Sequence, residues 1–86
     1  SFFLEQNYPN PFNPTTSVTF DLPRRSHVVL AVYDVLGREI AVLVDEMREA
    51  GRQSVEFQAD RYASGVYLYR LRADGFVQVR KMVLQK

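Results

Sequence analysis

Residues 66–84 read VYLYRLRADGFVQVRKMVL, and this stretch decides the fold. In its first half Tyr67, Tyr69 and Leu71 share one face of an alternating pattern, which is typical of a strand with one buried side. The pair Asp74-Gly75 that follows is the favoured sequence for a two-residue type I′ turn. The stretch therefore predicts an antiparallel β-hairpin.

The second half of this hairpin contains a conflict of phase. Val77 and Val79 fall on one face of the strand, whereas Met82 and Leu84 fall on the other. A β-bulge near residues 80–81 would bring these side chains to the same side. We therefore expect the last strand to be interrupted there.

Alternating patterns continue upstream, separated by turn signals at short intervals. Pro23 ends the first strand, and the loop 34–38, with Gly37 as its left-handed residue, predicts a second hairpin. Residues 27–33 are apolar at both parities, which indicates a central strand covered on both faces, and the polar run 45–50 predicts at most one helical turn. The expected strands are residues 17–22, 27–33, 39–44, 52–57, 66–73 and 76–84. Six or seven short strands without a long helix predict an all-β fold, an antiparallel immunoglobulin-like β-sandwich.

The first sixteen residues differ from the rest. Residues 7–14 read NYPNPFNP and hold three of the four prolines. Proline lacks a backbone donor and restricts the residue before it, so this segment cannot be a helix and should be extended, polyproline-like and turning. Asparagine side chains can replace the missing ladder partners, which predicts a stiff arm with Tyr8 and Phe12 as aromatic anchors. We therefore expect an arm over residues 1–16 that docks on a sandwich over residues 17–86.

Length and composition limit the remaining possibilities. At 86 residues, 47% of them hydrophobic, the chain should fold as one domain. A net charge of +1 without a basic segment argues against nucleic acid as a partner. Without cysteine and with a single histidine, we expect no disulfide, metal site or cofactor. The start lacks a methionine and no apolar run reaches about 18 residues, so we expect a module of a longer polypeptide rather than a signal peptide or anchor.

The residues that could carry chemistry have simpler interpretations. Ser26-His27 is the only Ser/His neighbour pair, but adjacent strand residues point to opposite faces and no nucleophile elbow accompanies them. Asp45, Glu46 and Glu49 lack the spacing around a glycine that a calcium loop needs. We therefore expect no catalytic residue and no metal ligand, and the chain is not expected to be an enzyme.

The sequence is compatible with two kinds of binding surface. Five tyrosines and six phenylalanines would suit carbohydrate binding, although most lie at inward parity. Among the large apolar residues, we expect exposure first at Tyr62 and Leu68. The last strand carries charged outward residues, which protect a sheet edge from pairing. The same edge could be paired by another protein or by a second copy, which would give a dimer through the terminal strand.

Four segments together resemble the C-terminal sorting domains (type A) of the type IX secretion system of Gram-negative bacteria. They span nearly the whole chain in the order of that family: NYPNPFNP (7–14), YDVLGRE (33–39), ASGVY (63–67) and KMVLQK (81–86). The second segment also gives a more distant likeness to the immunoglobulin-like domain of flagellar hook-capping proteins.

The resemblance implies a secretion signal that directs an attached passenger, often a hydrolase or adhesin, to the cell surface or medium. The outer-membrane translocon would recognise it in the periplasm, and a sortase-like peptidase would remove it. By the family pattern, recognition would fall on Gly65, Val66, Tyr67, Lys81, Met82 and Lys86. The arm that marks the start of the domain would comprise Tyr8, Pro9, Asn10, Pro11, Phe12 and Pro14. Tyr62 departs from the family pattern, which usually has leucine there.

A competing hypothesis is a non-catalytic accessory module, carbohydrate-binding or spacer, of a secreted multidomain hydrolase. Its distinguishing feature would be an outward platform of aromatic rings, because sugar faces stack on such rings. The absence of tryptophan weakens this hypothesis.

Overall fold

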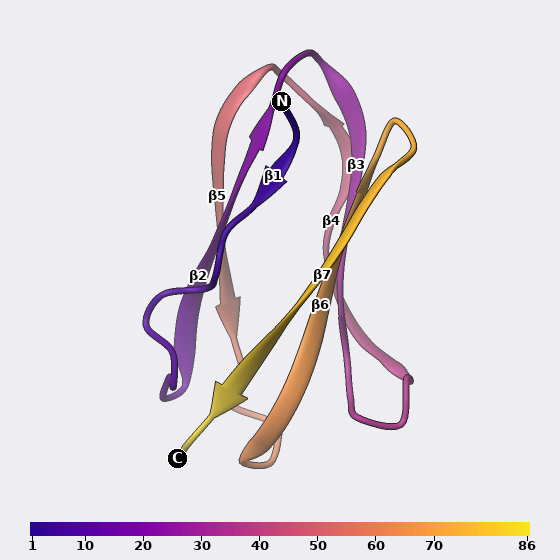
Figure 1. Cartoon of the computed structure of the whole chain (residues 1–86). Coiled ribbons are helices and arrows are strands. Elements are labelled where there is room, and N and C mark those ends of the chain that lie inside the picture. The colour runs from indigo at the N-terminus through magenta and orange to yellow at the C-terminus, as the bar shows by residue number, and fades with distance from the viewer.

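The alternating patterns of the sequence form seven strands in the computed structural model, which describes residues 1–86 (Figure 1). The strands are β1 (Phe3–Leu4), β2 (Thr15–Leu22), β3 (Ser26–Tyr33), β4 (Glu39–Arg48), β5 (Gly51–Gln58), β6 (Gly65–Ala73) and β7 (Phe76–Leu84). All paired strands are antiparallel. The predicted all-β sandwich is confirmed.

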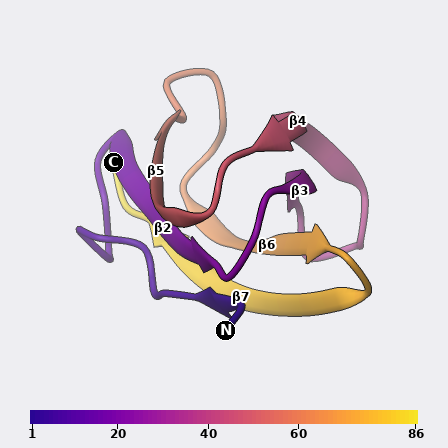
Figure 2. The ribbon, with the colours of Figure 1, turned by 90° about the horizontal axis from the view of Figure 1, so that it is seen from above.

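The strands form two sheets that face each other. One sheet has the order β1-β2-β5 and the other β4-β3-β6-β7, and Figure 2 shows the two layers from above. β3 lies between β4 and β6, so the central position predicted for residues 27–33 is confirmed, although no second layer covers their outer side. The chain contains no helix with the length and apolar character needed to cross a membrane.

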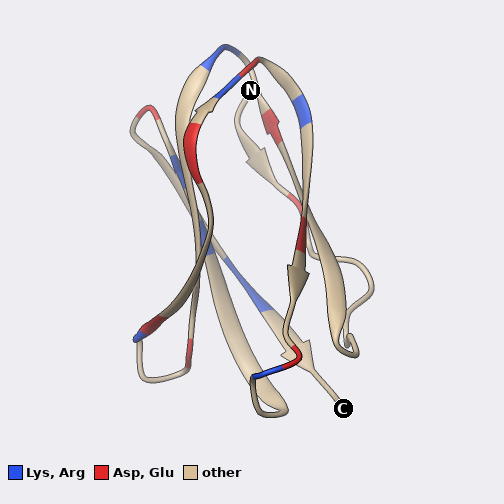
Figure 3. Ribbon diagram, turned by 180° about the vertical axis from the view of Figure 1, so that it is seen from behind, with Lys and Arg blue, Asp and Glu red and all other residues tan.

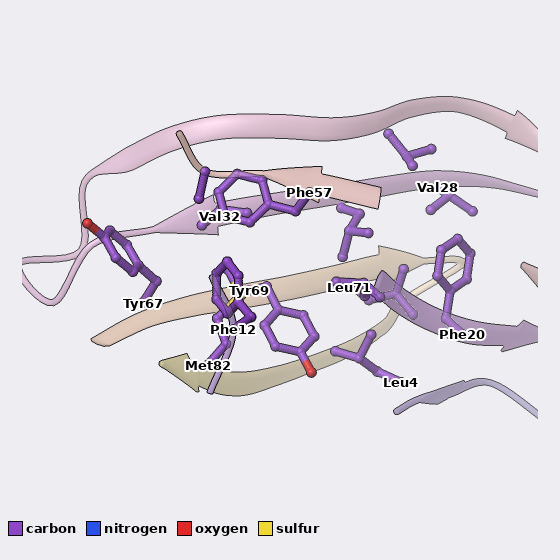
Figure 4. Close-up of a cluster of buried hydrophobic side chains, with 14 of the residues drawn as sticks. Leu4, Phe12, Phe20, Val28, Val32, Phe57, Tyr67, Tyr69, Leu71 and Met82 are labelled. Carbon is purple, nitrogen blue, oxygen red and sulfur yellow. The ribbon is translucent and has the colours of Figure 1, made fainter. Parts of the chain in front are cut away.

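Apolar side chains from both sheets fill the space between them. Phe20 of β2 and Phe57 of β5 point toward the sheet that contains Tyr69 and Leu71 of β6 (Figure 4). Tyr67, Tyr69 and Leu71 are all buried in this cluster, as the alternation predicts. Burial of one large apolar side chain contributes about 1.5–3 kcal/mol to the stability of the folded state. The hydrophobic burial in this common core is therefore the main contribution that holds the two sheets together.

The turn between β6 and β7 has the geometry that its sequence predicts. Asp74 and Gly75 have φ values of 49° and 82°, and a type I′ turn requires positive φ at both central positions. The Asp74 carboxylate also accepts a hydrogen bond of 2.9 Å from Nε of Arg24. The predicted hairpin is confirmed.

The second predicted hairpin joins β3 to β4 and is held by a carboxylate. Gly37 has a φ of 83°, and the Asp34 carboxylate accepts hydrogen bonds from the N–H groups of Leu36 and Arg38 over 2.9 and 3.0 Å. Nε of Arg38 donates a third over 2.7 Å. These bonds stabilise the ionised carboxylate, and the one from the Arg38 backbone contributes most to holding the pKa of Asp34 below its ordinary value of 3.8.

This hairpin should make the domain sensitive to acid. Because the pKa of Asp34 is lowered in the folded state, its contribution is present above the unfolded-state value of 3.8 and is lost as the pH falls through the folded-state pKa. We expect the urea midpoint of the wild type to fall more steeply between about pH 5 and pH 2 than that of Asp34→Asn. Urea titrations at stepwise pH measure both slopes, and equal slopes would contradict this role for Asp34.

The polar run 45–50 is not the helical turn that the sequence predicts. β4 continues through it to Arg48 because residues 45–48 pair with residues 26–29 of β3. Oδ1 of Asp45 lies 2.7 Å from Nε2 of His27 on the solvated side of this ladder. A strand with one solvated face tolerates polar side chains on that face, so the polar run does not end β4. β4 ends where its backbone pairing with β3 ends. β2 likewise begins two residues earlier than predicted.

The bulge expected in β7 is absent. Its register with β6 is unbroken, so Val77 and Val79 stay on the outer side and are half exposed. Gln78 and Arg80 take the inward positions because both bind the backbone of Leu4 in β1. Oε1 of Gln78 accepts a hydrogen bond of 3.2 Å from the N–H of Leu4, and Nε of Arg80 donates one of 2.6 Å to the carbonyl oxygen of Leu4. Contact with β1, which the sequence pattern does not show, resolves the conflict of phase.

Candidate recognition surface

The two segments that the family pattern assigns to recognition lie side by side in one sheet. Residues 65–67 of β6 pair with residues 82–84 of β7, and Lys81 pairs with Leu68. They lie at the end of the sandwich where the C-terminus is drawn in Figure 1. We call residues 65–67 and 81–86 the terminal patch, since the hairpin makes them one continuous surface.

The N-terminal arm borders the terminal patch along the outer edge of β7. The N–H of Phe12 donates to the carbonyl oxygen of Val83 over 2.9 Å, and the N–H of Gln85 donates to the carbonyl oxygen of Phe12 over 2.9 Å. The N–H of Val83 donates to Oδ1 of Asn10 over 2.9 Å, which confirms that asparagine replaces a ladder partner here. These are edge groups that another strand would otherwise use, so the arm occupies the edge of β7 at this end.

The arm turns back on itself as a closed loop, so the predicted turning is confirmed, whereas the predicted extended, polyproline-like form is wrong. Tyr8 and Ser17 close it with two backbone hydrogen bonds of 3.0 Å. Inside it, Nδ2 of Asn7 donates to the carbonyl oxygen of Pro9 over 3.2 Å and to Oγ1 of Thr16 over 3.0 Å. The buried side chains of Asn7 and Thr16, which sequence reasoning missed, thus hold together a segment whose prolines cannot donate to a ladder.

Only one of the two predicted aromatic anchors is buried. Phe12 is 2% exposed and packs against Phe57 with ring centroids 6.1 Å apart, whereas Tyr8 is 81% exposed. Tyr8 pairs with Ser17, and directly opposed residues project from the same face of a sheet. Because Val18 points into the core, Ser17 and Tyr8 point outward, so the prediction that Tyr8 anchors the arm is wrong.

The hydroxyl group of Tyr69 connects the arm to β6. It accepts a hydrogen bond from the N–H of Asn7 and donates one to the carbonyl oxygen of Glu5, both over 2.8 Å. Burial raises the pKa of Tyr69 above its ordinary value of 10.0, and the bond from Asn7 opposes that rise. The alternation identified Tyr69 only as a core residue. The signal in the sequence that could have identified this role is a tyrosine at a buried position, because its hydroxyl group usually finds a hydrogen-bond partner.

The loop between β5 and β6 completes this end of the sandwich. Nζ of Lys86 donates to the carbonyl oxygen of Asp60 over 2.5 Å, and the N–H of Lys86 donates to Oγ of Ser64 over 3.0 Å. Tyr62, which was expected to be exposed, is instead half-buried against the core. Its hydroxyl group donates to the carbonyl oxygen of Ile40 over 3.0 Å. The ring closes the gap between the loop and β4, which explains the difference from the prediction.

The residues predicted for recognition differ in exposure. Those with exposed side chains are Val66, Lys81 and Lys86, Gly65 is half-buried, and Tyr67 and Met82 are buried. Met82 is fully enclosed, and Figure 4 shows it pointing into the space between the sheets. The buried pair therefore shapes the terminal patch from inside, while the exposed residues form its surface.

The other residues with possible chemistry make surface contacts with one another and with arginine. Asp45 lies within hydrogen-bond distance of His27 at 2.7 Å, and ion pairs join Glu46 to Arg48 at 2.7 Å and Glu49 to Arg25 at 2.8 Å. Ser26 is buried and His27 exposed, so the two neighbours point to opposite faces as predicted. The arrangement supports binding through shape, hydrogen bonding and charge.

Comparison with known protein families identifies the family to which this domain belongs. Residues 6–85 match the model of the family described as "Secretion system C-terminal sorting domain". A search of curated proteins found no match. The matched region includes the arm from residue 6 onward, both hairpins and nearly all of the terminal patch, so the resemblance drawn from the four sequence segments is confirmed. The chain therefore belongs to the family of secretion system C-terminal sorting domains, the sorting signals of proteins that the type IX machinery exports to the cell surface or medium.

Proposed function

We propose that the terminal patch and the arm that borders it are the surface by which the outer-membrane translocon recognises this domain in the periplasm. The observation that carries the proposal is the pairing of residues 65–67 with residues 82–84. Two segments of the family pattern that are separated in sequence become one surface only in the folded hairpin. The domain would thus act as a folded signal, with no catalytic role of its own.

Export of different passengers by one translocon requires a feature that all of them present. A rigid sandwich end with distinctive side chains is such a feature, because specificity rests on a complementary surface rather than on the passenger. In this proposal Val66, Lys81 and Lys86 contact the translocon, and Gly65, Tyr67 and Met82 set the shape beneath them.

The arm has a structural part in the same proposal. Residues 1–16 would mark the start of the domain, and residues 17–86 would form the sandwich that the translocon reads. The loop of the arm would hold β7 in place through its hydrogen bonds to Val83. The residues of this loop are Pro9, Asn10, Pro11, Phe12 and Pro14. A sortase-like peptidase would then remove the domain after passage, and the passenger, a hydrolase or adhesin, would carry the activity.

Replacing the exposed lysines of the terminal patch should prevent export. A reporter enzyme with an N-terminal signal peptide, fused upstream of this domain, is expressed in a bacterium with a type IX system. We expect Lys81→Gln/Lys86→Gln to lower the surface and medium fraction about tenfold, the loss that follows when a contact worth about 1.4 kcal/mol is removed, and to leave active reporter in the periplasm.

The matched control is Arg24→Gln/Arg25→Gln. It removes the same charge from the turn between β2 and β3, at the opposite end of the sandwich (Figure 1). Point variants are preferable to deletion of residues 81–86, because deletion also removes Met82 and Leu84 from the core. Unchanged export of the lysine variant, or equal loss in the control, would exclude the terminal patch as the recognised surface.

A further inference from the structure

The outer side of the four-stranded sheet, which we call the outer face, is unusually apolar. It carries five of the nine large apolar side chains that are exposed in the domain: Val42, Met47, Val66, Val77 and Val79. Leu68, expected to be exposed, is half-buried among them together with Val29 and Tyr33. Exposed apolar residues gathered on one face mark an interaction surface more often than isolated ones do.

The same face carries three cations that form no ion pair. Arg70 and Arg72 of β6 and Lys81 of β7 point outward and form no ion pair. The arginines that pair with a carboxylate lie elsewhere: Arg24, Arg25, Arg38, Arg48 and Arg52. β6 and β7 contain no acidic residue, and Figure 3 shows blue but no red positions along both strands. The cations of the outer face therefore lack partners within the domain.

Arg70 borders a hollow that could receive a side chain. The hollow has a volume of about 240 Å³ and is lined by Tyr33, Gly37, Leu68, Arg70 and Val79. The guanidinium group of Arg70 lies over the Tyr33 ring, 5.0 Å from its centroid, and makes no hydrogen bond in the domain. Nε of Arg70 is shielded from solvent, so stacking holds the guanidinium in place and its terminal Nη groups are the donors that could meet a carboxylate.

We propose that the outer face docks a protein of the export machinery whose contacting surface is apolar and acidic. This inference rests on the proposed function and extends the contact surface from the terminal patch, which shares Val66 and Lys81 with the outer face, across the rest of that face. Carboxylates of the partner would pair with Arg70, Arg72 and Lys81, and apolar side chains would cover the valines between them. The domain extends over 36 × 23 × 17 Å, so one of its faces is of the order of the roughly 800 Å² that each partner gives to a standard interface.

An anionic membrane fits the outer face less well. Lipid headgroups are usually bound by clusters of about four to eight basic residues, and here three cations share the face with Glu39 and Asp45 of β4. The net charge of the chain is only +1. Directional donors beside a defined hollow favour a protein carboxylate over a diffuse lipid surface.

The test uses the same reporter fusion. We expect Arg70→Gln/Arg72→Gln to lower export about tenfold, while Arg70→Lys/Arg72→Lys, which keeps the charge but loses the planar guanidinium fork, restores only part of it. The matched control is Ser54→Glu/Gln58→Glu, which changes the net charge equally on exposed positions of β5 in the other sheet. Equal urea midpoints of the arginine variant and the wild type establish that folding is unchanged. Unchanged export of the glutamine variant would overturn the proposal.

The outcome separates this inference from the proposed function. If Lys86→Gln alone lowers export and Arg70→Gln/Arg72→Gln does not, the terminal patch is recognised and the outer face is not. Photo-cross-linking in intact cells from Val79→p-benzoylphenylalanine identifies the class of partner. An adduct with a component of the type IX machinery that disappears in Arg70→Gln/Arg72→Gln supports the proposal. Adducts with lipid alone, with a second copy of the fusion alone, or no adduct would overturn it.

Discussion

Replacing Phe12 with alanine is expected to destabilise the domain by about 3–5 kcal/mol. The ring is 2% exposed, packs against Phe57 and belongs to the main core cluster. Its removal leaves a cavity between the arm and the two sheets, and the cost of that cavity adds to the lost burial of the ring. Because small domains are stable by only about 5–15 kcal/mol, we expect a large fraction of the total stability to be lost.

The same loop supplies the control, Tyr8→Ala. Tyr8 is 81% exposed, so its truncation should change the free energy of unfolding by no more than about 0.5 kcal/mol. Urea unfolding followed by circular dichroism gives both values. Similar losses for the two variants would show that Phe12 does not hold the arm to the core in the way the structure indicates.

Replacing Tyr69 with phenylalanine is expected to cost about 1–3 kcal/mol although the ring is retained. The hydroxyl group satisfies the backbone N–H of Asn7 and the carbonyl oxygen of Glu5. Phenylalanine would leave both backbone groups without this partner, and an unsatisfied buried polar group carries its full desolvation penalty. We also expect faster proteolysis within residues 5–17, because the loop loses its connection to β6.

Tyr33→Phe is the matched control for this change. The hydroxyl group of Tyr33 is shielded from solvent and has no hydrogen-bond partner in the domain, so its removal should be neutral or slightly stabilising. Comparison of the two urea midpoints isolates the hydrogen bonds of Tyr69 from the general effect of losing a hydroxyl group. A midpoint for Tyr69→Phe as high as that of Tyr33→Phe would rule out the hydroxyl as the link to the arm.

Both changes act on the contact that places the arm beside β7. Phe12 contributes the apolar part and Tyr69 the polar part, and the backbone of Phe12 binds Val83 and Gln85 directly. Loss of either should therefore loosen the terminal patch as well as the core. This coupling connects the stability of the sandwich with its function as a folded signal.

Local pattern alone predicted the hairpins correctly. Alternation at Tyr67, Tyr69 and Leu71 and the Asp74-Gly75 pair are properties of neighbouring residues, and both reappear in the structure. Proline and glycine restrict the backbone at their own positions, so turns such as the one at Gly37 need no distant partner. The family resemblance depended on the same local segments and was confirmed for the same reason.

The predictions that failed concern residues whose environment comes from another part of the chain. The bulge in β7 was inferred from an apolar pattern, but Gln78 and Arg80 point inward because β1 approaches them. β4 extends through polar residues because β3 offers a ladder there. Tyr62 is half-buried because it reaches the carbonyl oxygen of Ile40. In each case a hydrogen-bond partner distant in sequence outweighed the local preference.

By itself, the sequence determined six of the seven strands, the turns at Gly37 and Asp74-Gly75, and the segments that mark the family, since these follow from the steric and hydrophobic preferences of adjacent residues. Tertiary structure alone decided that the arm meets the hairpin of β6 and β7 beside residues 65–67 and 81–86. It also decided that Phe12 rather than Tyr8 is buried. The physical reason is that pairing between strands distant in sequence, and burial between the two sheets, depend on which distant segments approach one another. A short stretch of sequence does not contain that information.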